Sequence, residues 1–199
     1  MAIFKGTIGA DTFVATAQAD NFYVNNVNDV IIGGNSQDTV YSLLSSYELA
    51  SGLGNLVLST GAISGTGNAG NNAIQGNLRD NILDGGMGQD LLMGGGGRDT
   101  FVFSHSGDLH ADSIIDYVPG VDKIAVRGSA FGLASGTPHD YVLNGQATSM
   151  NPTFIRMGSA GTAQSIYFDA DGVGAGKAQL ICTIQTFAGT TNINDFSII

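Results

Sequence analysis

Residues 85–102 read GGMGQDLLM and then GGGGRDTFV, two nonapeptides with Gly at positions one, two and four, Asp at position six and an apolar residue at position eight. Two related units, GNAGNNAIQ and GNLRDNILD, precede them, so this block covers residues 67–102. Four more units fill residues 6–41: GTIGADTFV, ATAQADNFY, VNNVNDVII and GGNSQDTVY. The sixth positions are Asp11, Asp20, Asp29, Asp38, Asn72, Asn81, Asp90 and Asp99. A fixed nine-residue period of this kind indicates a solenoid that binds metal.

Each unit combines a tight turn with a very short strand. Glycine at positions one, two and four permits the positive φ angles that a turn needs. The last three residues are rich in Val, Ile, Phe and Leu, and the eighth residue is expected to point inward while its neighbours point outward. Two units would then form one coil, and the following two units would stack on it as the next coil. The sixth positions that should face one another are Asp11 and Asp29, Asp20 and Asp38, Asn72 and Asp90, and Asn81 and Asp99.

Such turns expose backbone carbonyls and stack carboxylates of like sign. Hard oxygen ligands in a flexible cage of six or more suit Ca²⁺ rather than Zn²⁺ or Mg²⁺. A calcium ion between adjacent turns would satisfy the carbonyls and cancel the repulsion. The repeats therefore predict Ca²⁺ as the bound cofactor, with several ions per chain.

The two units at 85–102 match G-G-x-G-x-D-x-U-x at every defined position, and the chain resembles the RTX (repeats-in-toxin) calcium-binding family. The resemblance implies an all-β fold, a parallel β-roll with a C-terminal β-rich capping and secretion region. It also implies two sets of ligands: the carbonyls of Gly85, Gly86, Met87 and Gly88 with Asp90, and those of Gly94, Gly95, Gly96 and Gly97 with Asp99. Asn72 and Asn81 keep an oxygen but lose a charge, so weaker sites are expected there. The second and third units lack Gly at positions one and four, which predicts strained or metal-free turns.

Composition agrees with this interpretation. The chain has 199 residues, 30 of them Gly, a formal charge of −10 and a pI of about 4.2. The acidic balance argues against a nucleic-acid partner, whose phosphates attract basic patches. A flexible Gly-rich linker is the alternative, but a linker does not keep an apolar residue at one fixed phase. No segment is long and apolar enough to span a bilayer.

The N-terminal sequence MAIFKGTIGADTF has no apolar core of a signal peptide, which by itself favours a cytosolic protein. Free cytosolic Ca²⁺ is too low for loose repeat sites, however. The family resemblance implies instead a secreted, extracellular protein exported by a Gram-negative type I apparatus, and the ending NINDFSII is similar to the uncleaved C-terminal signal of that route. Cys182 is the only cysteine, which excludes an intrachain disulfide and predicts a buried thiol.

The chain divides into four parts: a first repeat block at 1–41, an irregular β insert at 42–66, a second repeat block at 67–103 and a C-terminal cap and secretion region at 104–199. Residues 112–126 resemble the segment that follows the roll in RTX proteins. There Asp112 and Asp122, with Asp116, could complete a terminal calcium site, the alternative being a polar strand–turn–strand. Residues 164–187 predict a β-hairpin or meander, in which the segment from Asp169 to Gly172 forms a turn or a further calcium site.

Signatures of catalysis are absent from the sequence. There is no HExxH, no G-x-S-x-G and no P-loop. His105 and His110, near Asp108 and Asp112, could bind a transition metal, or be solvated loop residues. We expect a secreted, non-catalytic protein that folds on binding Ca²⁺ outside the cell and engages an extracellular polysaccharide or a cell surface. The alternative is a folding and secretion module of a larger enzyme, such as a polysaccharide lyase, an epimerase or a protease.

Overall fold

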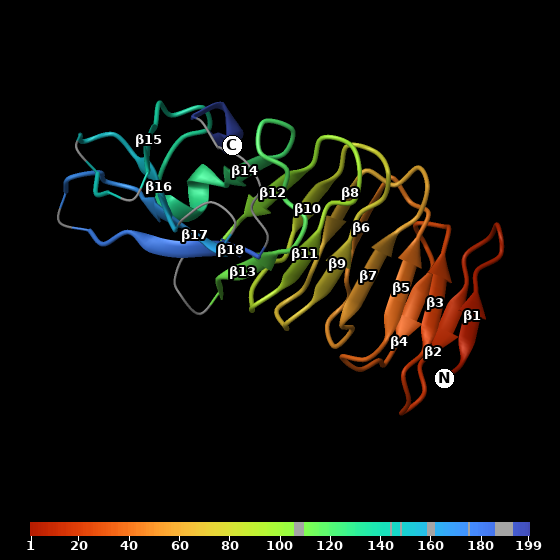
Figure 1. Cartoon of the computed structure of the whole chain (residues 1–199). Helices are drawn as coiled ribbons and strands as arrows, with labels where there is room; N and C mark the ends of the chain where they lie inside the picture. The colour runs from red at the N-terminus through yellow and green to blue at the C-terminus, as the bar shows by residue number, and fades with distance from the viewer. Residues whose placement is uncertain (106–109, 144, 148, 159–161, 175, 186–192) are drawn as a thin grey trace.

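The computed structural model describes residues 1–105, 110–143, 145–147, 149–158, 162–174, 176–185 and 193–199 (Figure 1). Nearly all of its regular structure is β-strand, and most strand pairs are parallel. Among the described residues, no helix has the length and the apolar composition needed to cross a membrane. The expected all-β fold, a parallel β-roll, is therefore confirmed.

The roll is built from two facing sheets whose strands alternate along the chain. The first sheet begins with β1 (Ile3–Lys5), β3 (Asn21–Val24), β5 (Thr39–Ser42), β7 (Asn55–Leu58), β9 (Ala73–Gln75), β11 (Leu91–Met93) and β13 (Asp112–Ile114). The second contains β6 (Ser46–Glu48), β8 (Ser64–Thr66), β10 (Ile82–Asp84), β12 (Thr100–Phe103) and β14 (Lys123–Val126). Two strands at the N-terminal end, β2 (Thr12–Val14) and β4 (Val30–Ile32), pair only with each other in the described residues.

The register confirms the predicted coil of two units. Phe22 pairs with Val40, and Leu83 pairs with Phe101, so each strand pairs with the strand two nonapeptides later in the sequence. Residues 42–66 contribute β6, β7 and β8 to the same two sheets. The coil that leads to β7 is shorter than a coil of two nonapeptides. Thr39 pairs with Asn55, whereas an unbroken nonapeptide frame would pair it with Val57. The insert is thus continuous with the roll although it departs from the frame.

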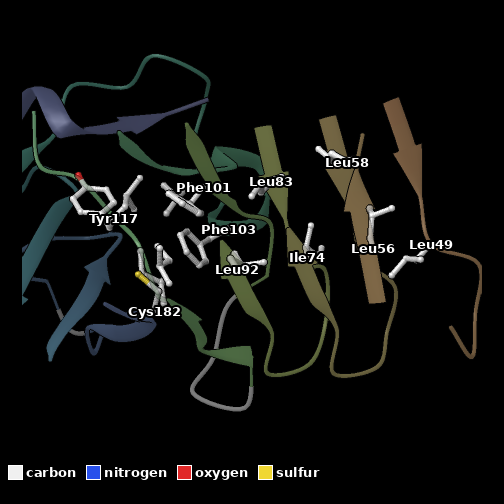
Figure 2. Close-up of a cluster of buried hydrophobic side chains, with 14 of the residues drawn as sticks. Leu49, Leu56, Leu58, Ile74, Leu83, Leu92, Phe101, Phe103, Tyr117 and Cys182 are labelled. Atoms are coloured by element: carbon white, nitrogen blue, oxygen red, sulfur yellow. The ribbon is translucent and has the colours of Figure 1, made fainter. Parts of the chain in front are cut away.

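The eighth residues of the units form the centre of the roll. Figure 2 shows Ile74, Leu83, Leu92 and Phe101 along its interior. Each of these side chains is 0–1% exposed. The residue before each of them is at least partly exposed, and Ile82 is 46% exposed; of the residues that follow them, Asp84 and Val102 are buried. This alternation is what a three-residue strand with one buried face requires, since successive side chains point to opposite faces. The inward position predicted from the repeat is confirmed.

The C-terminal region closes one end of the roll. β13 and β14 follow their partners after connections longer than those of the repeats, as Leu91 pairs with Ser113 and Thr100 with Lys123. Beyond β13 the first sheet continues in order with β18 (Gln179–Ile184), β17 (Gln164–Asp169), β16 (Thr153–Met157) and β15 (Asp140–Leu143). In the second sheet β19 (Phe196–Ile198) pairs with β14. β17 and β18 are antiparallel, which confirms the predicted hairpin. Cys182 is a buried free thiol, as expected.

Candidate calcium sites

The turns of the roll form two rows, one along each edge. The first turn row leads into the strands of the first sheet, and the second turn row leads into the strands that face it. The acidic or amide residues that end the turns of the first row are Asp20, Asp38, Asn72, Asp90 and Asp112. Those of the second row are Asp11, Asp29, Asn81, Asp99 and Asp122.

Within each repeat block, and from the second block into the cap, hydrogen bonds link the sixth residues of a row from one coil to the next. In the first row the N–H of Asn72 donates to Oδ1 of Asp90 (2.6 Å), and the N–H of Asp90 donates to Oδ1 of Asp112 (2.9 Å). In the second row the N–H of Asp99 donates to Oδ1 of Asp122 at 3.0 Å. The predicted facing pairs are therefore neighbours in space, and the two cap residues continue both rows.

In the N-terminal block the second carboxylate oxygen is also occupied. Oδ2 of Asp20 accepts the N–H of Thr16 (2.6 Å), and Oδ2 of Asp38 accepts the N–H of Asn35 (2.8 Å). Burial opposes ionisation of Asp20, yet the N–H donors of Ala2 and Thr16 outweigh it, so that the pKa of Asp20 is lowered. The carboxylate oxygens of Asp20 and Asp38 thus already accept hydrogen bonds from the backbone.

The glycine-rich turns differ at this second oxygen. Asp90 is 2% exposed, and its Oδ2 has no hydrogen-bond partner within the described part of the chain. A Cβ on Gly85 would lie 2.2 Å from that oxygen, and a Cβ on Gly94 would lie 2.3 Å from Oδ2 of Asp99. An unpaired buried carboxylate oxygen is costly, because nothing replaces the water that it has lost. The turn therefore presents a negative group that lacks a positive partner.

The pKa values of the buried carboxyl groups in these turns are also raised, as expected where a positively charged partner is lacking. Burial, then the charge of Asp90, raise the pKa of Asp112 to about 8. Burial, with a smaller contribution from the charge of Asp84, raises the pKa of Asp90 to about 7. Burial also raises the pKa of Asp99 to about 6, and that of Asp122 above its ordinary value. A bound cation would reverse these shifts, because it favours the charged form.

The donor set suits calcium. In the described residues, no three His, Cys, Asp or Glu side chains gather as they would around a metal held by side chains alone. An ion here must also use backbone carbonyls, which hard cations accept and Zn²⁺ seldom does. Backbone oxygens do crowd the glycine turns, since a Cβ on Gly86 would lie 2.5 Å from the carbonyl oxygen of Asn68. Calcium would supply positive charge to Asp90, Asp99 and the cap carboxylates.

Two cap residues contact the glycine turns in a way that the sequence did not predict. Nδ1 of His110 accepts the N–H of Gly88 (3.0 Å), and the carboxylate of Asp116 accepts the N–H groups of Gly94 (2.9 Å) and Gly95 (2.8 Å). His110 thus acts as an acceptor for a turn, and its ring lies 6.0 Å from that of His105. Asp108, the third member of the hypothetical transition-metal group, lies outside the described residues.

The Asp169–Gly172 segment forms a turn. The N–H of Gly176 donates to Oδ2 of Asp171 (2.9 Å), and the N–H of Gly174 donates to the carbonyl of Asp171 (3.1 Å). Burial, then a hydrogen bond to Asp171, raise the pKa of Asp169. Backbone donors thus bind Asp171, the residue on which a further calcium site would depend.

Comparison with known proteins identifies the repeats. The family model of the RTX calcium-binding nonapeptide repeat (4 copies) matches residues 5–40 and 66–101. No curated protein matches the chain. The two matched stretches coincide with the two blocks of nonapeptides, and they include Asp90, Asp99 and both glycine-rich turns. Residues 5–40 and 66–101 are thus RTX calcium-binding nonapeptide repeats, and these repeats form coils of the roll.

Proposed function

We propose that this is a secreted, non-catalytic protein whose glycine-rich coils fold when they bind Ca²⁺ outside the cell. The observation that carries the proposal is the buried, unpartnered Oδ2 of Asp90 beside a turn in which only glycine fits. Without a cation, the carboxylates of Asp90 and Asp112 oppose the rolled form. With calcium, the same carboxylates and the turn carbonyls bind the ion, and binding stabilises the rolled form by mass action.

The burial of Phe196 and Ile198 supports export of a chain whose C-terminal cap is open. The ending that is similar to a type I secretion signal forms η3 (Ile193–Asp195) and β19, and β19 pairs with β14 at the closed end of the roll. Phe196 and Ile198 are 3% and 4% exposed. A secretion apparatus can contact these side chains only when the cap is open. We propose that the calcium-poor cytosol keeps it open and that extracellular calcium closes it.

The proposed partner is an extracellular polysaccharide. A groove of about 520 Å³ crosses the outer face of the first sheet beside the glycine-rich turn. Its lining is mostly uncharged and hydrogen-bonding, a composition that suits the hydroxyl groups of sugars. The side chains that contribute amides and hydroxyls are Asn55, Asn71, Gln89, Ser113 and Thr183. Calcium at Asp90, which also lines this groove, would order its floor.

Two measurements test the proposal. Far-ultraviolet circular dichroism and calorimetric titration of the full chain should show calcium binding together with a gain of β structure. A screen of immobilised polysaccharides should show binding in calcium that is lost in chelator. A chain that binds no calcium, or that has the same spectrum with and without it, would refute the folding mechanism. Calcium binding without any retained polysaccharide would refute the proposed partner alone.

A further inference from the structure

Asparagine side chains link the coils of the first turn row up to residue 72. The amide Nδ2 of Asn72 donates to the carbonyls of Leu53 (3.1 Å) and Gly54 (3.3 Å) in the preceding coil. The other donors of this row act on turn carbonyls in the same way: Asn35 to Gln18 (3.3 Å), and Asn68 to Ala50 (2.9 Å) and Leu53 (2.8 Å). Each bond joins a turn to the one stacked before it.

The second turn row repeats this arrangement. Nδ2 of Asn81 donates to the carbonyls of Ala62 (3.2 Å) and Ile63 (3.4 Å). Its other members are Asn25 to Gly6 (3.1 Å), Asn26 to Ile8 (2.9 Å), and Asn77 to Ser59 (3.0 Å) and Ala62 (2.9 Å). We call these two sets of bonds the asparagine clamps.

The clamps stop where the glycine-rich turns begin. Residues 85–99 contain no asparagine, and Asp90 and Asp99 stand where Asn72 and Asn81 stood one coil earlier. Oδ1 of Asn72 accepts the N–H of Asn68 (2.8 Å), whereas Oδ2 of Asp90 is buried without a partner in the described residues. The sequence position is the same, but a neutral, saturated amide is replaced by an unsaturated carboxylate.

An amide donor and a calcium ion act alike on a turn carbonyl. Both present positive charge to its oxygen, and each amide hydrogen bond contributes about 1 kcal/mol. The amide is neutral, so stacked asparagines do not repel one another as stacked carboxylates do. A coil that is linked by asparagine therefore needs no ion, whereas a coil with glycine turns and a free carboxylate does.

We infer that asparagine amides replace calcium in the coils up to residue 84, and that calcium is required only for the coils from residue 85 to residue 126. The second half of this inference rests on the proposed calcium-dependent function, while the first half does not. The N-terminal coils are then a metal-independent platform on which the calcium-binding coils and the cap assemble. Asp11, Asp20, Asp29 and Asp38 act in it as acceptors of N–H groups, and Asn72 and Asn81 as clamps, so none of these six residues binds an ion.

Hydrogen exchange of the full chain, read by mass spectrometry at the level of peptides, tests the division directly. In chelator, amides of β3, β5 and β7 should keep their protection, while those of β11, β12 and β14 should lose about 100-fold or more through local opening. In calcium both sets should be protected. Loss of protection in β3, β5 and β7 on removal of calcium would overturn the inference.

The double variant Asn72→Asp/Asn81→Asp tests the clamps themselves. It removes the amide donors and restores carboxylates at the sixth positions, so peptides covering 55–81 should become calcium-dependent and the number of bound ions should rise. Unchanged protection in chelator, with an unchanged number of ions, would overturn the inference. A wild-type chain that binds no calcium would instead refute the proposed function, and protection of β3, β5 and β7 in chelator would still support the clamps.

Discussion

Replacing Asp90 by Asn should have opposite effects without and with calcium. In calcium-free buffer the change removes one of two facing buried carboxylates. The pKa of Asp90 is raised from 3.8 to about 7, and at about 1.4 kcal/mol per pKa unit its ionisation in the fold costs at most ~4 kcal/mol. The groove beside Asp90 admits solvent, which reduces this cost. We therefore expect Asp90→Asn to stabilise the calcium-free protein at pH 8 by about 1–3 kcal/mol.

With calcium the same substitution removes a proposed ligand. For a dissociation constant near 10⁻⁴ M, typical of extracellular sites, about 10 mM calcium stabilises one site by ~2.7 kcal/mol. In a chain of this length, 1 kcal/mol shifts the melting temperature by about 2–4 °C. The rise in melting temperature on adding calcium should therefore be smaller by about 5–10 °C in Asp90→Asn than in the wild type.

Asp38→Asn is the matched control, because Asp38 lies in the same row at 0% exposure and both of its oxygens accept N–H groups. Loss of a charged acceptor should destabilise this variant by about 1–3 kcal/mol in both buffers, with the full calcium-induced rise retained. Thermal melts followed by circular dichroism measure all three chains. If Asp90→Asn melts below the wild type in calcium-free buffer, as Asp38→Asn does, or keeps the full calcium-induced rise, the reasoning about the unpartnered oxygen is refuted.

Three further predictions concern pH, turn geometry and packing. The pKa values of Asp90 and Asp112 are raised in the fold to about 7 and about 8, so the folded state binds more protons than the unfolded state. The free energy of unfolding of the calcium-free protein should therefore fall as pH rises from about 4 to about 8. Denaturant titrations in which this free energy rises with pH would contradict the prediction. Gly85→Ala places a Cβ 2.2 Å from Oδ2 of Asp90 and should weaken calcium binding about tenfold or more in calorimetric titration. In the control Gly9→Ala the nearest atom to the new Cβ is 3.7 Å away, so calcium affinity should be unchanged. Equal affinities of the two variants would contradict the proposed site. Leu83→Ala should cost about 2–5 kcal/mol by denaturant unfolding, and Ile82→Ala, at 46% exposure, at most about 0.5 kcal/mol; similar losses would mean that the inward face is assigned wrongly.

The nine-residue period was sufficient to predict the coil and its core. Because a three-residue strand has one inward position, the eighth residue of each unit had to supply the interior, and Leu83 and Phe101 do so. Because two units make one coil, Asn72 had to face Asp90, and a hydrogen bond joins them. These results depend on local geometry that repeats, which is why one sequence reveals them.

The difference between satisfied and unsatisfied carboxylates could not be predicted from the same pattern. Asp38 and Asp90 occupy equivalent positions, but the turn before Asp38 directs the N–H of Asn35 at its second oxygen, and the turn before Asp90 directs none. The sequence did suggest Asp112 and Asp122 as ligands of a terminal site, but not their alignment with Asp90 and Asp99, because the longer connections that precede them break the period. The asparagine clamps had a sequence signal, the recurrence of Asn in the early turn positions, whose meaning depends on where the amide points.

The location of Asp90, whose Oδ2 is buried without a partner among the described residues, determines what calcium can control. Asp90 and Asp99 lie in the last coil of the second repeat block. Their N–H groups donate to Oδ1 of Asp112 and of Asp122, which belong to the cap. In a roll each coil is stabilised mainly by its neighbours, so weakening one interface separates what lies on either side of it. Removal of calcium should therefore detach the cap, with β19 and its proposed export signal, from N-terminal coils that the asparagine clamps keep assembled. On this proposal the ion would act at the joint between two parts, rather than along the whole roll.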